Sequence, residues 1–146
     1  MKAQEIKVKH IYYVDFEPTK KGELGNRHLA VVLKKNNDNI TFVTIPLTSK
    51  ESGSGVNKVN LGKLECLPEN LRQNESFAVY DQIRTVNAGR FYKLIENKAY
   101  IDVELPDEKF SLLFECILRD LMFDLDNREK ENICNKLYKE YSCKKE

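Results

Sequence analysis

Arg27 and Thr48 are two residues of this sequence whose side chains could bind one phosphate group together. Arg27 opens an apolar run at 29–33, and Thr48 with Ser49 follows a second apolar run from Ile40 to Leu47. A guanidinium offers forked N–H donors and a hydroxyl offers one more, so the pair could hold a phosphodiester if their strands end side by side. The pattern therefore predicts binding or chemistry at a phosphodiester.

A third polar segment, from Tyr80 to Val86, could add donors to the same site. If the segment is a strand, alternation puts Gln82 and Arg84 on one face and Asp81 on the other. Gln82 and Arg84 would then suit a base edge or a phosphate. An antiparallel strand whose polar face meets water explains the segment equally well, and composition does not decide between the two.

A series of short strands in the first two-thirds of the chain must position these groups. The dense turn signal from Lys35 to Asn39 predicts a hairpin between the strands that it joins. Several short strands at intervals of about 8–12 residues, with no helical pattern between them, predict a small β-barrel or sandwich. The predicted strands are Lys7 to Phe16, His28 to Lys34, Ile40 to Leu47 and Ser76 to Val86, with a weaker signal at Val56 to Leu61 and a loop at Ser52 to Gly55.

Helical character begins at Pro106. Acidic residues follow this proline, as is typical of the first turn of a helix. Apolar side chains from Phe110 to Met122 then recur at helical spacing. Asp126 and Glu129 resemble a capping box for a second helix that reaches about Tyr141.

The composition limits the class of protein. The chain has 146 residues and a net charge of +1, enough length for a core but no global attraction to nucleic acid. We expect a single domain overall, with a catalytic barrel at 1–105 and a helical extension at 106–146 that packs on the barrel or a dimer interface. The four cysteines form no CxxC pair, so we expect no metal site and no cofactor. The absence of a signal peptide and of an apolar stretch near the ~20 residues of a membrane span favours a soluble cytoplasmic protein.

Four short motifs occur in order along the chain. An extended strand ends in Tyr13-Val14-Asp15-Phe16, followed by Pro18 and Gly22-Glu23. Arg27 then precedes Ala30-Val31-Val32, Pro46-Leu47-Thr48-Ser49 closes the next strand, and Asp81 to Val86 follows with Arg90 beyond it. In this order and spacing, over residues 6 to 95, the chain resembles the MazF/PemK family of toxin ribonucleases from toxin–antitoxin pairs.

The resemblance implies a fold and an activity. The fold would be an SH3-like β-barrel with added helices, acting as a homodimer. The activity would be metal-independent cleavage of single-stranded RNA at a short sequence, with the 2′-hydroxyl attacking the adjacent phosphate to leave a cyclic phosphate and a 5′-hydroxyl. An antitoxin protein would neutralise the toxin, and the complex of the two would bind DNA.

The same resemblance implies roles for individual residues. Arg27 and Thr48 would form the catalytic pair, because a transition state with charge on phosphate oxygens needs fixed donors. The residues expected near the RNA are Ser49, Gln82, Arg84 and Glu23. Since a guanidinium stays protonated, we favour Arg27 as an electrostatic clamp over an acid.

The identity of the general base stays open among three residues. Asp81 ranks above Glu23, although either carboxylate would need a raised pKa. His28 has the most suitable ordinary pKa, but in a regular strand it would point away from Arg27. The chain also departs from the family pattern, with His28 in place of a proline and Val79 where some members have a second arginine.

Two other functions fit the same sequence. One is a catalytically silent barrel that acts by binding protein, as the related CcdB-like gyrase poisons do. The other is a non-catalytic RNA-binding protein that uses the same groove.

Overall fold

The computed structural model describes residues 1–50 and 57–121, together with isolated positions between 126 and 139. The chain divides into two compact units, Met1–Pro106 and Asp107–Glu146, and each is described by itself. The predicted loop at Ser52 to Gly55 and most of the second predicted helix lie outside the described residues. No helix in the described part of the chain is long and apolar enough to cross a membrane.

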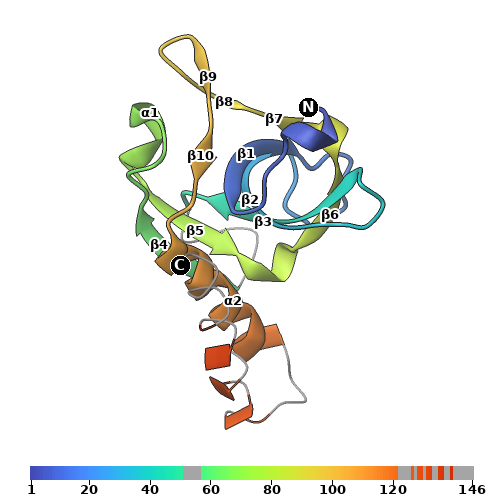
Figure 1. Ribbon diagram of the computed structural model, residues 1–146. Coiled ribbons are helices and arrows are strands. Elements are labelled where there is room, and N and C mark those ends of the chain that lie inside the picture. Colours follow the sequence, from blue (N-terminus) through green and yellow to red (C-terminus); the bar gives the residue numbers. More distant parts are fainter. Residues whose placement is uncertain are drawn as a thin grey trace. The chain divides into compact units, whose positions relative to one another are not determined.

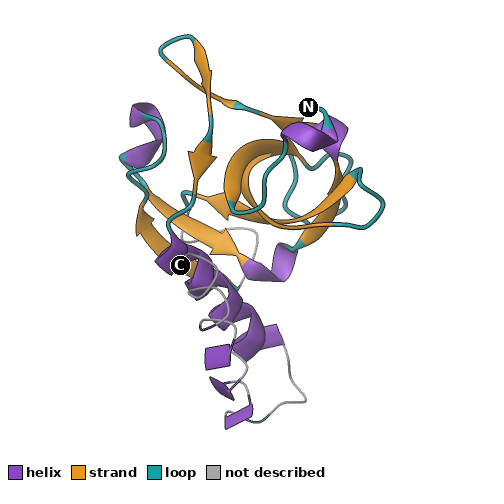
Figure 2. Cartoon of the chain, viewed as in Figure 1, coloured by secondary structure: helices purple, strands orange, loops and turns teal. Residues whose placement is uncertain are grey.

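The first unit is built from short antiparallel strands, and its helical segments are single turns (Figure 2). Strands β1, β2 and β3 follow one another at its centre, and the longer sheet runs in the order β10-β1-β2-β3-β5-β4, with β6 also on β3 and β7 also on β1. The strands are β1 (His10–Asp15), β2 (Arg27–Lys35), β3 (Thr41–Thr48), β4 (Lys58–Lys63), β5 (Glu75–Val79), β6 (Arg84–Asn87), β7 (Phe91–Tyr92), β8 (Leu94–Glu96), β9 (Ala99–Ile101) and β10 (Val103–Glu104). The helical turns are η1 (Ala3–Glu5), α1 (Glu69–Arg72), η2 (Tyr80–Gln82) and η3 (Ala88–Arg90).

The sheet curls into a small barrel-like fold. Two consecutive strands, β6 and β7, pair with β3 and β1, and so bring these two strands toward each other. β6 pairs with β3, and η3 carries the chain across to β7, which pairs with β1 (Figure 1). The amide of Ala88 in η3 donates to the carbonyl of Ile40 at 2.9 Å. β6 and β7 meet through η3 and not through a continuous ladder, so the curl is not a fully hydrogen-bonded barrel.

Alternation along these strands decides what lies inside the curl. Tyr12 and Val14 of β1 are buried in its core, while Tyr13 between them points to the outer face. Phe91 meets Tyr12 and Phe42 edge to face, with ring centroids 5.9 and 5.5 Å apart. The core consists of Ile6, Tyr12, Val14, Phe16, Ala30, Val32, Phe42, Val86, Ala88 and Phe91.

Most of the predicted strands are confirmed, including the mainly β, barrel-like fold and the hairpin of β2 and β3. The single predicted strand from Ser76 to Val86 is wrong. The chain forms β5, turns through η2 and resumes as β6, so that both strands share the edge of β3. The break faces the part of β3 that contains Pro46, a residue with no N–H to donate to a neighbour.

The hairpin of β8 and β9 was not predicted. Its turn residues Asn97 and Lys98 both have positive φ, as a two-residue hairpin turn requires. The hairpin presents Ile95 and Tyr100, which are 56% and 73% exposed. It thereby adds large apolar side chains to the surface of the first unit.

The second unit begins with α2 (Asp107–Leu121), as predicted from Pro106. Asp107 and Glu108 lie in its first turn, where acidic side chains stabilise the positive end of the helix dipole. Phe110 and Phe114 pack edge to face one turn apart. Beyond α2, the amide of Asp126 donates to Glu129 and the amide of Glu129 donates to Asp126, so the predicted capping box is present.

Candidate phosphate-binding site

The register of the sheet brings Arg27 and Thr48 to the same end of neighbouring strands. Arg27 is the first residue of β2 and lies opposite Asp15 of β1. Leu29 pairs with Leu47 of β3, so the last residue of β3, Thr48, comes beside the first residues of β2. The two residues whose types suggested a phosphate site are therefore neighbours in the fold.

Arg27 and Thr48 line one surface hollow of about 610 Å³, here called the phosphate hollow. Its lining is basic, since Lys50 and Lys58 contribute with Arg27, and Glu75 is the one acidic residue among the described residues that line it. The Lys58 ammonium donates to the Lys50 carbonyl at 3.0 Å, which joins β4 to the end of β3. An excess of positive charge in a concave site attracts an anion. The polar and charged lining residues are Asn26, Arg27, His28, Thr48, Ser49, Lys50, Lys58, Asn74, Glu75 and Ser76.

The guanidinium of Arg27 rests on an aromatic ring. Its central carbon lies 4.0 Å from the centroid of Tyr92, and Tyr92 is held by the pairing of β7 with Tyr13 of β1. The stack leaves the N–H groups at the edge of the guanidinium, and within the described part of the chain none of them donates to a protein acceptor. Arg27 thus presents oriented donors at the mouth of the hollow.

Thr48 is oriented by a local hydrogen bond. Its Oγ1 accepts from the amide of Lys50 at 3.2 Å, and the residue is half-buried. Because the oxygen is the acceptor here, the hydroxyl hydrogen is left to donate. Threonine is also stiff about χ1, so the donor is held in place. Ser49, the next residue, lines the same hollow and is exposed.

His28 also contributes to the lining of the phosphate hollow, and the regular pairing of Arg27 with Asp15 and of His28 with Val14 keeps the two side chains on opposite faces of β2, as alternation predicts. Val14, the partner of His28, belongs to the core, whereas Tyr92, on which Arg27 stacks, pairs with Tyr13 on the other face. Burial lowers the pKa of His28, hydrogen bonds with the backbone of Gly25 and Leu47 oppose this, and the positive charges of Arg84 and Lys50 add to it. The lowered pKa favours the neutral form of the imidazole, which is the form that a base requires.

The structure does not bring the two carboxylate candidates to Arg27. Asp81 is exposed in η2 and accepts from the side-chain amide of Asn57 at 3.2 Å. Glu23 is exposed too, and its carboxylate accepts from the amide of Lys20 at 3.0 Å within their own loop. Neither of them is among the described residues that line the hollow.

Gln82 and Arg84 face the loop that precedes Arg27. Gln82 Oε1 accepts from the amide of Leu24 at 3.1 Å and from the Arg84 guanidinium at 3.0 Å, and Nε2 donates to the Gly22 carbonyl at 3.4 Å. The Arg84 guanidinium also lies 5.1 Å from the ring centroid of Phe16. The segment Tyr80 to Val86 therefore ties down the loop that precedes Arg27.

The same loop is closed at its base by residues that sequence reasoning did not assign to the site. Glu17 Oε1 accepts from the amide of Asn26 at 2.7 Å, and the amide of Phe16 donates to the Asn26 carbonyl at 3.1 Å. Arg90 donates to the carbonyls of Asp15 and Glu17. These bonds fix the backbone immediately before Arg27. Nothing in the sequence pairs Glu17 with Asn26, and the connection is visible only in space.

The described residues contain no group of three or more His, Cys, Asp or Glu side chains placed to hold a metal ion.

The family model for the PemK-like, MazF-like toxin of type II toxin–antitoxin systems matches residues 7–118. The chain belongs to this toxin family. The match covers the whole curled sheet and most of α2, and it confirms the resemblance drawn from the four motifs. It makes the protein a toxin component of a toxin–antitoxin system.

Solved structures agree with this assignment at the level of the fold. The crystal structure of MazF (form I) from Deinococcus radiodurans aligns with a TM-score of 0.57 at 20% identity, over 81% of this chain and 97% of that one. The crystal structure of MazE–MazF (form II) from the same organism aligns with a TM-score of 0.50 at 18% identity, over 80% of this chain and 94% of that one. No curated protein sequence matches the chain.

Proposed function

We propose that this toxin is a metal-independent endoribonuclease that cleaves single-stranded RNA at a short sequence. The observation that carries the proposal is the placement of Arg27, whose guanidinium is braced on Tyr92 and shares a basic hollow with Thr48. Donors fixed before the reaction stabilise charge as it develops on phosphate oxygens, and they need no reorganisation during the reaction.

The proposed reaction is an internal transfer within the RNA. The 2′-oxygen forms a bond to the adjacent phosphorus, and the bond from phosphorus to the 5′-oxygen breaks, which leaves a 2′,3′-cyclic phosphate and a 5′-hydroxyl. Arg27 and Thr48 would donate hydrogen bonds to the non-bridging oxygens. One proton must leave the 2′-hydroxyl, and one must reach the 5′-oxygen.

We favour His28 as the base because it is the one of the three candidates that lines the phosphate hollow, on the other face of β2 from Arg27. Burial favours its neutral form by lowering its pKa. Asp81, which ranked first from the sequence, and Glu23 stay candidates only if the RNA or a second subunit brings them closer. A His28→Gln variant tests the assignment, because it would lose most of the cleavage rate while Asp81→Asn would keep it.

Cleavage of a mixed-sequence RNA in EDTA tests the proposed function. The wild-type protein should cut and leave cyclic-phosphate ends, and Arg27→Ala should lower the rate by about 10²–10³, as for loss of one oxyanion donor. Arg27→Lys keeps the charge but loses the fork, so it should recover only part of the rate. Lys21→Ala is a matched control, because Lys21 is an exposed cation of the neighbouring loop outside the hollow lining. Equal cutting by Arg27→Ala and wild type, or no cutting at all, would overturn the proposal.

The proposed partners are a second copy of the chain and an antitoxin. The related MazF from Deinococcus radiodurans crystallised with MazE, and this chain shares its fold. An antitoxin that carries an acidic segment would suit the basic phosphate hollow. Sedimentation of the purified protein tests dimer formation, and inhibition of cleavage by an added acidic peptide tests the second partner.

A further inference from the structure

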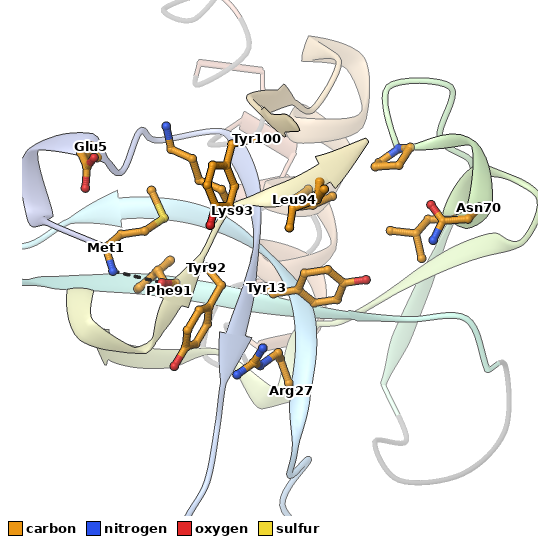
Figure 3. Close-up of a pocket in the computed structure, with 13 residues that line it drawn as sticks. Met1, Glu5, Tyr13, Arg27, Asn70, Phe91, Tyr92, Lys93, Leu94 and Tyr100 are labelled. Atoms are coloured by element: carbon orange, nitrogen blue, oxygen red, sulfur yellow. Dashed lines mark hydrogen bonds between the residues drawn. The ribbon is translucent and has the colours of Figure 1, made fainter. Parts of the chain in front are cut away.

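A second hollow lies on the other side of Arg27. It has a volume of about 540 Å³, within the ~300–1,000 Å³ of sites that take small molecules, and it shares Tyr13, Arg27 and Leu71 with the phosphate hollow. We call it the aromatic hollow. Figure 3 shows Arg27 below Tyr92 on one side of it, and the ring of Tyr100 on the opposite side. The residues that the argument uses are Tyr13, Arg27, Asn70, Tyr92, Lys93 and Tyr100.

Three tyrosines line this hollow, and two of them expose much of their side-chain surface. Tyr92 is 41% exposed and Tyr100 is 73% exposed, while Tyr13, which pairs with Tyr92, is half-buried. They come from β7, β9 and β1, so the fold gathers them from separate segments. Tyr100 lies opposite Ile95 in the β8–β9 hairpin, which holds it out over the hollow. Open tyrosine faces are suitable platforms for unpaired nucleobases, since every base has a flat π-face.

Polar side chains at the rim could contact the edge of a stacked base. Asn70, at the start of α1, is exposed and offers both a carbonyl acceptor and an amide donor. Lys93 offers a cation, which lies 4.0 Å from the Asp102 carboxylate, the limit of an ion pair. Asparagine matches the adjacent donor and acceptor of a base edge. A lining of rings with a few polar groups is typical of a site that takes a flat, polar-edged ligand.

Arg27 connects the two hollows. Its guanidinium covers the Tyr92 ring at 4.0 Å, so a phosphate bound to Arg27 would lie directly beside the aromatic hollow. The nucleotide attached to that phosphate then has its base within reach of the hollow. Single-stranded RNA offers a phosphate for the cation of Arg27 and a base for the neighbouring tyrosine rings.

We propose that the aromatic hollow binds a nucleobase of the RNA next to the phosphate at Arg27, with Tyr100 as a stacking platform and Asn70 reading the base edge. The proposal rests on the proposed function and adds to it a site that contributes to sequence preference. Stacking accepts any base, so the preference would come from Asn70.

The absence of tryptophan from the chain allows a direct test of stacking. In a Tyr100→Trp variant the introduced indole is the only one, and a base stacked on it should quench its fluorescence. The probe is a single-stranded RNA oligonucleotide with 2′-O-methyl groups. These groups replace the attacking 2′-hydroxyls and so prevent cleavage. An abasic oligonucleotide of equal length is the matched control, because it keeps the phosphates and lacks the bases. Quenching by the first and not by the second is the expected result.

Affinity of the same oligonucleotide gives a second measurement. Tyr100→Ala should weaken binding about tenfold, within the range for loss of one stacked base, and Tyr100→Phe should keep the wild-type value. Asn70→Ala should change which bases are preferred next to the cut and leave binding of the abasic chain unaltered. Because Tyr100 is 73% exposed, its replacement is not expected to disturb folding.

The outcomes separate this proposal from the proposed function. Normal cleavage by Tyr100→Ala, with no quenching of the Tyr100→Trp variant by any oligonucleotide, would overturn the base site and leave the ribonuclease intact. Quenching by bases without any cleavage would support the base site and overturn the ribonuclease. A change in the fluorescence of Tyr100→Trp with protein concentration alone, and none with the oligonucleotide, would mean that a second copy of the chain covers the hollow, which would also overturn the base site.

Discussion

The guanidinium carbon of Arg27 lies 4.0 Å from the centroid of the Tyr92 ring. The two residues come from β2 and β7, and both of these strands pair with β1. Closure of the curled sheet by β7 therefore supports the side chain that we propose as the phosphate clamp. The stack orients the guanidinium without using any of its hydrogen-bond donors.

Removal of the Tyr92 ring should loosen this clamp. We expect Tyr92→Leu to lower the cleavage rate about two- to fivefold, since a cation–π contact at an exposed site contributes ~0.5–1 kcal/mol. Tyr92→Phe keeps the ring face and should cleave like the wild type. The measurement is the single-turnover rate with a short RNA. A rate for Tyr92→Phe as low as that for Tyr92→Leu would show that the hydroxyl, and not the ring face, is what matters.

Loss of the Glu17 carboxylate should disturb the backbone that leads into Arg27. Glu17 accepts from the amides of Asn26 and Thr19. We expect Glu17→Ala to cost about 1 kcal/mol of stability, the ordinary contribution of such a bond, and to lower the cleavage rate by displacing Arg27. Glu17→Gln retains an acceptor oxygen and should lose less of both. Denaturant unfolding and the cleavage rate of the two variants check this, and equal behaviour of Ala and Gln would contradict it.

Replacement of Gln82 should show whether this residue positions the loop or contacts RNA. Its Oε1 satisfies the part-buried amide of Leu24 as well as the Arg84 guanidinium. We expect Gln82→Ala to lower the free energy of unfolding by about 1–3 kcal/mol, because a part-buried donor is left unpaired. Gln82→Glu keeps the acceptor and should retain most of the stability. Unchanged stability of Gln82→Ala together with weaker RNA binding would instead favour direct contact with RNA, as expected from the sequence.

The lowered pKa of His28 predicts a dependence of stability on pH. Burial is the main cause, and the folded state therefore binds the proton less readily than the unfolded state does. Stability due to this group is fully present above the unfolded value of about 6.5 and is lost as the pH falls from there toward the lowered folded pKa. His28→Gln should flatten that part of the profile. Urea midpoints measured between pH 8 and pH 5 check the slope, and an unchanged slope in His28→Gln would contradict the assignment.

The elements that followed from the sequence are those with strong local signals. The apolar run of β2, the turn from Lys35 to Asn39 and the amphipathic pattern of α2 are each set by residues close together in the chain. The break between β5 and β6 was missed, because it depends on which part of β3 each strand pairs with. That pairing is a contact between distant residues, which a local pattern does not contain.

The sequence by itself determined the family and the barrel-like fold, and it singled out Arg27 and Thr48 as polar residues at strand ends, because local residue types and spacing carry that information. Only the tertiary structure decided what surrounds them. It placed Tyr92 under Arg27, brought His28 into the phosphate hollow, left Asp81 and Glu23 outside it, and turned Gln82 toward the loop. These outcomes follow from strand register and from the curl that joins β6 to β7. Each depends on packing between segments far apart in the chain, which periodicity cannot predict.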